Sequence, residues 1–252
     1  MSTSYEKVLE NLQELKLNRM SVILNGYLER STKEKIPLLD SLEFLSKEEI
    51  LYKNDNSLKM RTKLAGFPYQ KTFEQFDFNF QPGIDKSIIN ELRTMRFVHQ
   101  AENVILLGPP GVGKTHLSIS LGLEAIRNKF STYYLNCHDL ISSLNQAQFE
   151  NKLNQRIKNL CKYKVLVIDE VGYLPIDKQG ANLFFQLVSK RYEKGSIILS
   201  SNKGFNQWDE VFGDASAAIL DRLLHHSTSI NIKGDSYRIK DKKNQLLKKN
   251  LK

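Results

Sequence analysis

The segment from Gly108 to Thr115 reads GPPGVGKT, and it constrains the fold of this chain more than any other feature. It follows the apolar run 104–107 and precedes a helical pattern over residues 115–129. It therefore matches G-x-x-x-x-G-K-[ST] in the strand–loop–helix context that the motif requires. This context favours a phosphate-binding loop over a tight glycine turn that holds no ligand.

The chemistry of such a loop is anion binding. Glycines let backbone N–H groups turn inward around phosphate oxygens, and the following helix presents its positive N-terminal end. We expect Lys114 to reach the β- and γ-phosphates of ATP and the Thr115 hydroxyl to bind Mg²⁺. The predicted nucleotide-binding residues of this segment are Gly108, Pro109, Pro110, Gly111, Val112, Gly113, Lys114, Thr115 and His116.

Polar side chains also follow two later apolar runs. Asp169 and Glu170 come directly after 165–168, and Asn202 lies just beyond the strand expected at 197–200. Because ligands meet the carboxyl ends of parallel strands, we expect Asp169 to hold Mg²⁺ through water, Glu170 to accept the proton of an attacking water, and Asn202 to orient that water. The alternatives are solvated turn residues. Nucleotide storage needs no positioned base, so the acidic pair favours hydrolysis.

The order of apolar patterns predicts an α/β fold, with a parallel sheet covered by helices on both faces, as in P-loop NTPases. The expected strands are 104–107, 132–135, 165–168, 197–200 and 228–232. The connection 139–163 is long enough for two helices. Four phenylalanines at 73, 76, 78 and 80 either pack on the sheet or border the adenine.

Four regions follow from these patterns. Residues 1–65 form a small helical domain, in which Ser46 and Glu49 have the spacing of a capping box at a helix start. Residues 66–84 are a linker, 85–240 the ATPase domain and 241–252 a basic tail. The net charge is +9, and residues 233–252 alone hold eight basic and two acidic side chains. Such a balance suits a polyanionic partner.

Other features exclude several classes of protein. No apolar run approaches the roughly 20 residues that span a bilayer, and the N-terminus has no signal-peptide pattern, so we expect a cytoplasmic protein without a membrane partner. Cys137 and Cys161 have no metal-ligand spacing and are expected to be buried thiols. His225 and His226 are adjacent and would point apart on a helix, which argues against shared metal binding.

The motif order carries a family resemblance. GPPGVGKT, VLVIDE, SSN, the LDRL of residues 220–223 and the DSYR of residues 235–238 together resemble the AAA+ ATPases. The chain is most similar to the IstB-like transposition helper proteins of insertion sequences, which are related to DnaC-type helicase loaders. The segment 219–226, ILDRLLHH, resembles IstB more than the loaders. The similarity runs from the N-terminal helices to Arg238.

The resemblance implies a ring or spiral assembly in which Arg222 enters the nucleotide site of a neighbouring subunit, where a guanidinium suits the charge of a transferring phosphoryl group. The alternative for Arg222 is a surface charge paired with Asp221 or Asp214. Arg238 resembles a sensor residue that contacts the nucleotide within its own subunit. Only 14 residues follow Arg238, too few for the full C-terminal helical lid of many AAA+ proteins.

A DNA partner is expected at the two-helix insertion, where this branch resembles initiator proteins. Lys152, Arg156 and Lys158 lie at helical spacing and would contact phosphates without reading base sequence, with duplex DNA expected rather than a single strand. The alternative is an ordinary solvated helix face.

Three functions fit this set of features: an ATPase that assembles on DNA and assists a transposase, a DnaC-like loader of a replicative helicase, and a small-molecule phosphotransferase. The predicted catalytic residues are Lys114, Glu170, Asn202 and Arg222. The acidic pair and the arginine in trans argue against the phosphotransferase.

Overall fold

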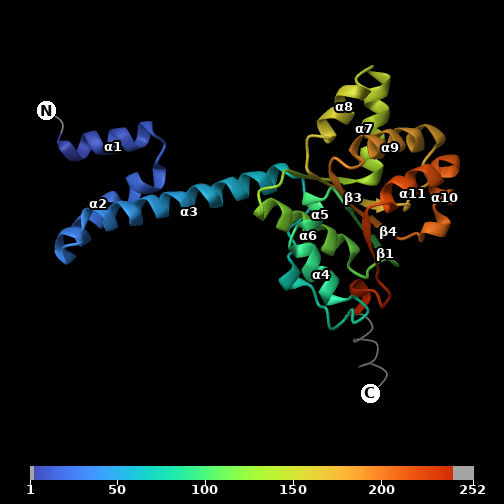
Figure 1. Ribbon diagram of the computed structural model, residues 1–252, viewed down its shortest axis with the longest axis horizontal. Coiled ribbons are helices and arrows are strands. Elements are labelled where there is room, and N and C mark those ends of the chain that lie inside the picture. The colour runs from blue at the N-terminus through green and yellow to red at the C-terminus, as the bar shows by residue number, and fades with distance from the viewer. Residues whose placement is uncertain (1–2, 241–252) are drawn as a thin grey trace. The chain divides into compact units, whose positions relative to one another are not determined.

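The computed structural model describes residues 3–240, and the chain divides into two units, Met1–Met60 and Arg61–Lys252 (Figure 1). The predicted basic tail, 241–252, lies outside the described residues. Within the described part of the chain, no helix is long and apolar enough to cross a membrane.

The first unit is helical, as predicted. It contains α1 (Ser4–Glu14), α2 (Asn18–Glu34) and most of α3 (Leu38–Leu64), which continues past Met60. Leu24, Tyr27 and Leu45 form its small buried core. Tyr27 stacks on Phe44, with ring centroids 4.8 Å apart.

The predicted helix start at Ser46 is wrong, because α3 passes through this position without a break. The Ser46 hydroxyl donates to the Glu43 carbonyl one turn back. Glu49 is 3% exposed and accepts a hydrogen bond of 2.9 Å from the backbone N–H of Met20 in the first turn of α2. Its carboxylate therefore satisfies the beginning of a different helix from the one its spacing suggested.

The second unit is built on a parallel sheet of five strands among the described residues, in the order β2-β3-β4-β1-β5. The strands are β1 (Asn103–Leu107), β2 (Thr132–Asn136), β3 (Val165–Val171), β4 (Ser196–Ser201) and β5 (Ser227–Asn231). Each contains most of a predicted strand. β1 lies between β4 and β5, so the phosphate loop leaves the sheet between two other strands.

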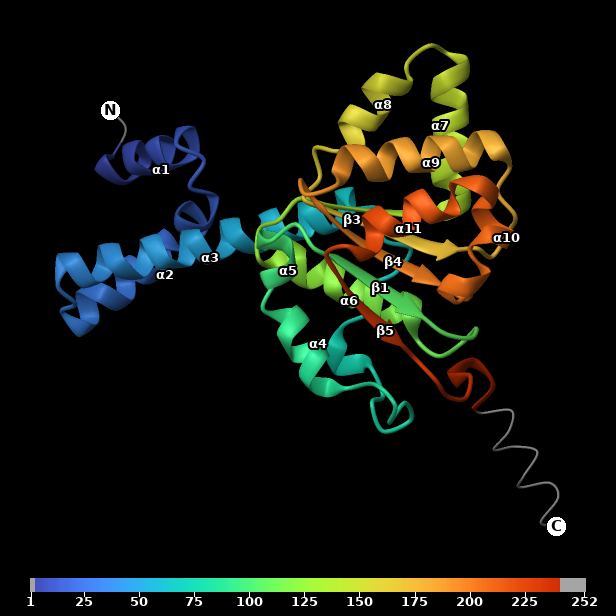
Figure 2. The same ribbon diagram turned by 45° about the vertical axis from the view of Figure 1, so that its right-hand side comes forward.

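Helices cover both faces of this sheet, as predicted (Figure 2). One face holds α4 (Lys86–Arg93), α5 (Arg96–His99) and α6 (Lys114–Arg127). The other holds α7 (Cys137–Phe149), α8 (Leu153–Leu160), α9 (Lys178–Arg191), α10 (Asp209–Phe212) and α11 (Ser216–Leu224). Both helices expected in the long connection are present, as α7 and α8.

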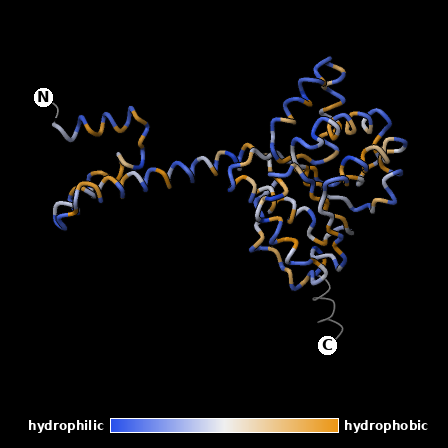
Figure 3. The backbone as a smooth tube through the Cα atoms, in the orientation of Figure 1, coloured by the Kyte–Doolittle hydropathy of each residue, from blue (hydrophilic) through white to orange (hydrophobic). Residues whose placement is uncertain are grey.

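The burial of β1 shows why the strands read as continuous apolar runs. Val104 and Leu106 pack into the core beneath α6, whereas Ile105 and Leu107 pack into the core beneath α9 and α11. Alternate side chains of a strand point to opposite faces, and here both faces are buried. The covering helices instead alternate between hydrophobic and hydrophilic residues along the chain (Figure 3).

The linker, residues 66–84, packs against the sheet. Phe73 is buried in the core beneath α6, with Phe76 and Phe78 at its edge. Ahead of these residues, the carbonyl of Ala65 accepts a hydrogen bond of 2.8 Å from the N–H of Tyr134 on β2. This segment therefore covers part of the outer edge of the sheet.

Candidate nucleotide site

The phosphate loop connects β1 to α6 through backbone that favours glycine. Gly111 and Gly113 have φ angles of 83° and 102°, in the left-handed region. A Cβ atom at Gly113 would lie 2.5 Å from the Phe76 ring, and one at Gly111 would clash with the Ser236 hydroxyl. The linker and the end of the second unit thus close around the loop and leave no room for larger residues.

Lys114 is the first residue of α6, and its side chain folds back across the loop. Its Nζ donates to the carbonyl oxygens of Gly108 and Pro109, at 2.7 and 2.9 Å. Burial lowers the pKa of Lys114 from its ordinary value, while the nearby Asp169 carboxylate opposes this shift. The ammonium is therefore held at the loop by weak carbonyl partners, which a phosphate can replace.

Asp169 lies 1% exposed at the end of β3, surrounded by hydroxyl groups. Thr115 Oγ1 donates to its Oδ1 at 3.2 Å, Tyr134 OH donates to its Oδ2 at 2.9 Å, and the Ser200 hydroxyl donates to Oδ1. Burial raises the pKa of Tyr134, and the Asp169 charge adds to this effect, so the phenol remains a donor. The buried carboxylate is thus paired by hydrogen bonds from three different elements.

Glu170 leaves the strand through an irregularity in the sheet. The register between β3 and β4 shifts between Ile168 and Val171, and Glu170 has a φ of 61°. A bulge of this kind changes the direction of a side chain beside a site. Asp169 consequently stays buried under the loop, while the next carboxylate is exposed at the rim of the pocket.

Asn136 binds both Glu170 and the first turn of α7. Its Nδ2 donates to Glu170 Oε2, and its Oδ1 accepts a hydrogen bond of 2.9 Å from the N–H of His138. It is the N-cap residue of α7. The position of the Glu170 carboxylate is therefore tied to the beginning of the two-helix insertion.

The elements enclose a pocket of about 350 Å³ beside the loop. Its lining includes Pro110, Gly111, Val112, Gly113, Lys114, Thr115, His116, Glu170, Ser200, Asn202 and Arg238. Asn202 Oδ1 is buried and has no hydrogen-bond partner within residues 3–240. The predicted loop residues from Pro110 to His116 thus face one cavity with Glu170, Asn202 and Arg238, and this cavity has room for a nucleotide. Gly108 and Pro109 do not line it.

Two predicted residues contribute differently from the rest. Pro109 meets Lys114 through its carbonyl oxygen. His116 lines the pocket, but its Nε2 also lies 2.8 Å from the Thr72 carbonyl, and its ring contacts Phe76 edge-on. Burial lowers the pKa of His116 from its ordinary value, so the neutral ring is favoured.

Arg222 does not line this pocket. Its guanidinium lies 4.6 Å from the centre of the Phe185 ring, and Nη1 donates to the Ala218 carbonyl at 3.2 Å. Asp214, one of the acidic partners considered for it, pairs with Lys178 at 3.8 Å instead. The Arg222 side chain sits on α11 over an aromatic ring, away from the nucleotide loop of its own chain.

The basic residues of the insertion do not share one environment. Lys152 is the N-cap residue of α8 and pairs with Glu150 at 2.9 Å. Arg156 is half-buried, with Nη2 3.3 Å from the Ser143 hydroxyl of α7. Lys158 is exposed in the last turn of α8.

Sequence reasoning missed Tyr134, Asn136 and Ser200, which position the acidic pair. The available signal was the parallel register, because Asn136 lies directly opposite Asp169 and both end their strands. The strand at 132–135 was predicted, and extending it by one residue would have placed Asn136 beside the site. Ser200 was in a predicted strand, but nothing in its pattern indicated a contact with Asp169.

Comparison with known proteins assigns the chain to a family. The family model described as IstB-like ATP binding protein matches residues 10–245. The chain belongs to this family. It is 46% identical to a protein of Bacillus thuringiensis subsp. berliner named for ATP binding in insertion sequence IS232, over 96% of this chain and 97% of the relative. It is 47% identical to the corresponding Pseudomonas aeruginosa protein of insertion sequence IS21, over 92% and 88%.

Solved structures show the same fold for this IstB-like chain. DnaA from Aquifex aeolicus, solved with AMPPCP bound, superposes with a TM-score of 0.55 at 22% identity, over 74% of this chain and 58% of that chain. DnaI superposes with a TM-score of 0.55 at 19% identity, over 65% and 91%. The predicted AAA+ P-loop fold is confirmed.

Proposed function

We propose that this IstB-like protein hydrolyses ATP and assembles on DNA to assist a transposase. The observation that carries the proposal is that the phosphate loop and the exposed Glu170 carboxylate line one pocket, while the buried Asp169 carboxylate accepts a hydrogen bond from Thr115 at the end of that loop. Binding alone would require only the loop, whereas Glu170 at the rim supplies a base. Relatives named for insertion sequences support the transposition context.

The residues beside the loop fit a magnesium ion. Thr115 Oγ1 and the Asp169 carboxylate are 3.2 Å apart, and such hard oxygen ligands suit Mg²⁺, with water completing the coordination. When bound, Mg²⁺ would neutralise charge on the β- and γ-phosphates. Asp169 would act through water, because its oxygens already accept hydrogen bonds from Tyr134 and Ser200.

Hydrolysis would depend on Glu170 and Asn202. Glu170 would take the proton of the attacking water, and the unpartnered Oδ1 of Asn202 gives a second contact that orients the same water. In the structure Asn136 holds one Glu170 oxygen. The other carboxylate oxygen, Oε1, is left to accept the proton, while the hydrogen bond from Asn136 restrains the direction of the Glu170 side chain.

Two arginines would complete the site. Arg238 faces the pocket from the same chain and would contact the phosphates there. Arg222 lies outside that pocket, which is compatible with a role in a neighbouring subunit. A guanidinium supplied in trans would make hydrolysis depend on assembly into a ring or spiral.

DNA contact is proposed at the insertion, through Lys152, Arg156 and Lys158. Lys158 is exposed, and Lys152 pairs only with Glu150 at the surface. Because such a surface ion pair is weak, both lysines can bind DNA phosphates instead of water or Glu150. Asn136 begins α7 and holds Glu170, so a shift of α7 on DNA would change the position of the catalytic base. DNA binding and hydrolysis would then be coupled through one residue.

ATP binding is tested with Lys114→Ala. We expect a loss of at least about 100-fold in affinity for a fluorescent ATP analogue, because a charge-assisted phosphate contact is removed. Lys129→Ala, an exposed lysine beyond the end of α6, is the control. Equal affinity in both variants would remove Lys114 from the site.

Hydrolysis is tested with Glu170→Gln, which keeps the shape of the side chain and removes its basicity. We expect ATP to bind with little change while phosphate release falls by about 100-fold or more, in the range of general-base catalysis. Glu210→Gln, at an exposed carboxylate paired with Lys203, is the control. Unchanged turnover in Glu170→Gln would exclude Glu170 as the base.

The assembly is tested by mixing Arg222→Ala with Lys114→Ala. Each variant alone should be inactive, and the mixture should recover part of the hydrolysis, because some interfaces then pair an intact loop with an intact arginine. If hydrolysis does not recover at any mixing ratio of the two variants, Arg222 acts within its own chain or only in packing.

DNA contact is tested with the combined variant Lys152→Ala/Arg156→Ala/Lys158→Ala. We expect weaker duplex binding and a salt dependence whose slope falls by about 0.9 for each phosphate that the variant no longer neutralises. A control removes Lys178, Lys190 and Lys194 in the same way. If the slope of the salt dependence is equal in the two variants, the basic residues of the insertion do not contact DNA and form an ordinary solvated helix face.

The partner is tested by stimulation of ATP turnover. A transposase encoded beside this gene should change the turnover of the DNA-bound protein, whereas a replicative helicase should not. The opposite result would favour the helicase-loader alternative, for which the same nucleotide-site motifs are expected.

A further inference from the structure

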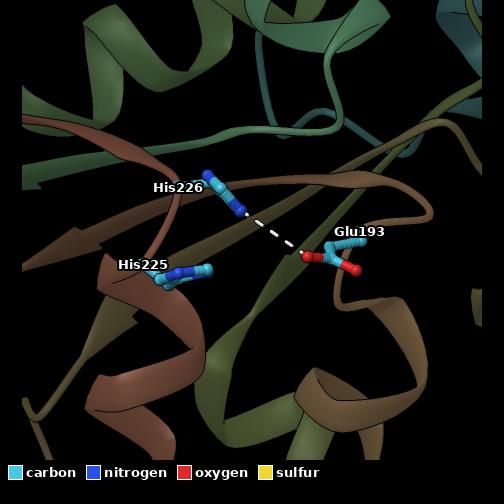
Figure 4. A group of neighbouring side chains, drawn as sticks. All are labelled: Glu193, His225 and His226. Atoms are coloured by element: carbon cyan, nitrogen blue, oxygen red, sulfur yellow. Dashed lines mark ion pairs between the residues drawn. The ribbon is translucent and has the colours of Figure 1, made fainter.

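Three side chains of the types that ligate metal ions lie close together in the second unit, outside the nucleotide pocket. Glu193, His225 and His226 each offer one ligand atom, and these atoms lie within 4.8 Å of one another (Figure 4). Glu193 lies in the turn between α9 and β4, with a φ of 57°. The histidines lie between α11 and β5, so two separate connections supply the ligands.

The end of α11 explains why adjacent histidines converge. The expectation that they point apart assumes a continuous helix, but α11 ends at Leu224 and His225 is its C-cap residue. The two rings lie with centroids 4.0 Å apart. His226 Nε2 is 3.6 Å from Glu193 Oε1, on the dashed line of Figure 4.

We propose that Glu193, His225 and His226 bind a divalent transition-metal ion of the zinc class. Two imidazoles and one carboxylate are a donor set that Zn²⁺ accepts with a fourth position left open. Ligands at tetrahedral zinc distances lie about 3.3 Å apart, as follows from bonds of about 2.0 Å. The 3.6 Å between His226 and Glu193 is close to this spacing.

The ligand atoms can reach zinc-binding distances by movement of exposed side chains. His226 and Glu193 have 48% and 59% of their side-chain surface exposed, and His225 is also exposed. Closing ligand atoms from at most 4.8 Å to about 3.3 Å therefore requires rotation of surface side chains and no repacking of the core. An ion can also reach them directly from solvent.

Tyr192 orients one of the ligands. Its hydroxyl lies 2.6 Å from Nδ1 of His225, and its ring lies beside both histidine rings. A metal-binding histidine is commonly held through its other ring nitrogen, which fixes the ring and its tautomer. In the tautomer with the proton on Nδ1, His225 donates this hydrogen bond to the Tyr192 hydroxyl oxygen, which gives His225 this support and leaves Nε2 for the ion.

The metal would connect the ends of two helices. Tyr192 and Glu193 directly follow α9, and His225 directly follows α11, which carries Arg222. A bound ion would hold the carboxyl end of α11 to the end of α9. This inference does not depend on the proposed ATPase function, because none of the ligands lines the nucleotide pocket.

The test uses the full chain, freed of metal with a chelator and kept without nucleotide. Zn²⁺ is titrated by calorimetry and Co²⁺ by its visible absorption, which reports a site of low coordination number. We expect one zinc ion per chain at this site. His225→Ala and His226→Ala should each weaken Zn²⁺ binding by more than about 100-fold, beyond the 10–100-fold typical of a supporting residue.

Matched variants separate the site from other histidines and from the nucleotide pocket. His99→Ala and His138→Ala, at exposed positions elsewhere, and Lys114→Ala should keep the wild-type affinity for Zn²⁺. Tyr192→Phe should keep the ion but weaken its binding by about 10-fold. His226→Gln and circular dichroism spectra check that the loss is not a failure to fold.

Two results would overturn the proposal. One is a wild-type chain that binds no Zn²⁺ at a concentration of about 100 μM. The other is equal Zn²⁺ affinity in the wild-type chain and in folded His225→Ala and His226→Ala, which would place any bound metal elsewhere.

Discussion

Removing the Tyr134 hydroxyl tests how the buried Asp169 carboxylate is stabilised. Tyr134→Phe keeps the ring and its contact with Phe67, at a centroid distance of 5.8 Å, and removes only the donor to Asp169 Oδ2. A hydrogen bond to a charged group contributes about 1.5–3 kcal/mol. Thr115 and Ser200 continue to donate to the other oxygen. We therefore expect a decrease of about 2 kcal/mol in the free energy of unfolding.

The measurement is urea and thermal unfolding of the full chain without nucleotide, followed by circular dichroism. A decrease of about 2 kcal/mol corresponds to a Tm lower by about 4–8 °C for a unit of this size. The decrease should be constant from about pH 6 to 9. Burial raises the pKa of Tyr134 above its ordinary value of 10.0, so the folded hydroxyl remains protonated throughout this range, and its contribution disappears only as the pH rises above 10.

The control is Tyr133→Phe, at the neighbouring residue of β2, whose ring stacks on Tyr163 instead of contacting Asp169. It should change stability by less than about 0.5 kcal/mol. If Tyr134→Phe matches this control, the hydroxyl does not stabilise the buried carboxylate, and the reasoning is refuted.

Asn136→Asp keeps a capping oxygen for α7 but places a carboxylate against Glu170, so the hydrogen bond that restrains Glu170 is lost. Basal phosphate release should rise about three-fold or more and respond less to DNA. A fall in phosphate release both with and without DNA would contradict the idea that Asn136 restrains Glu170. Burial raises the pKa of Cys137 to about 12. In a Cys161→Ser background, alkylation at about pH 8 should therefore be at least about 100-fold slower in the folded chain than in urea. Arg191→Met removes donors to the carbonyls of Leu160, Tyr163, Lys164 and Ser196, and should cost more than about 3 kcal/mol in urea unfolding.

The parallel sheet was predictable because its inner strands, β1, β3 and β4, are buried on both faces. Residues 165–168 at the beginning of β3 read as an apolar run, and the helices between the strands have a different period. The start of α3 was not predictable from Ser46 and Glu49, because local spacing does not show that Glu49 satisfies a distant helix, at Met20. Interactions between elements decided the outcome there.

The residues of the candidate site also divide into those that the sequence predicts and those that depend on contacts between elements. Gly108–Thr115 and Asp169 could be predicted, because one contiguous motif and one strand end specify them. Tyr134 and Asn136 could not, because their roles depend on which strand pairs with β3 and on the bulge that turns Glu170 outward. The convergence of His225 and His226 depended on the residue at which α11 ends.

The position of β1 between β4 and β5 has a consequence for synthesis of the chain. Leu107, which leads into the phosphate loop, pairs with Ser201 on one side and Asn231 on the other. Both partners emerge from the ribosome much later than Leu107, because the chain is made from the N-terminus. Until then β1 has two open edges, which are hazards for aggregation. The strand that leads into the phosphate loop therefore does not have both of its neighbours until residues 227–231 have been made.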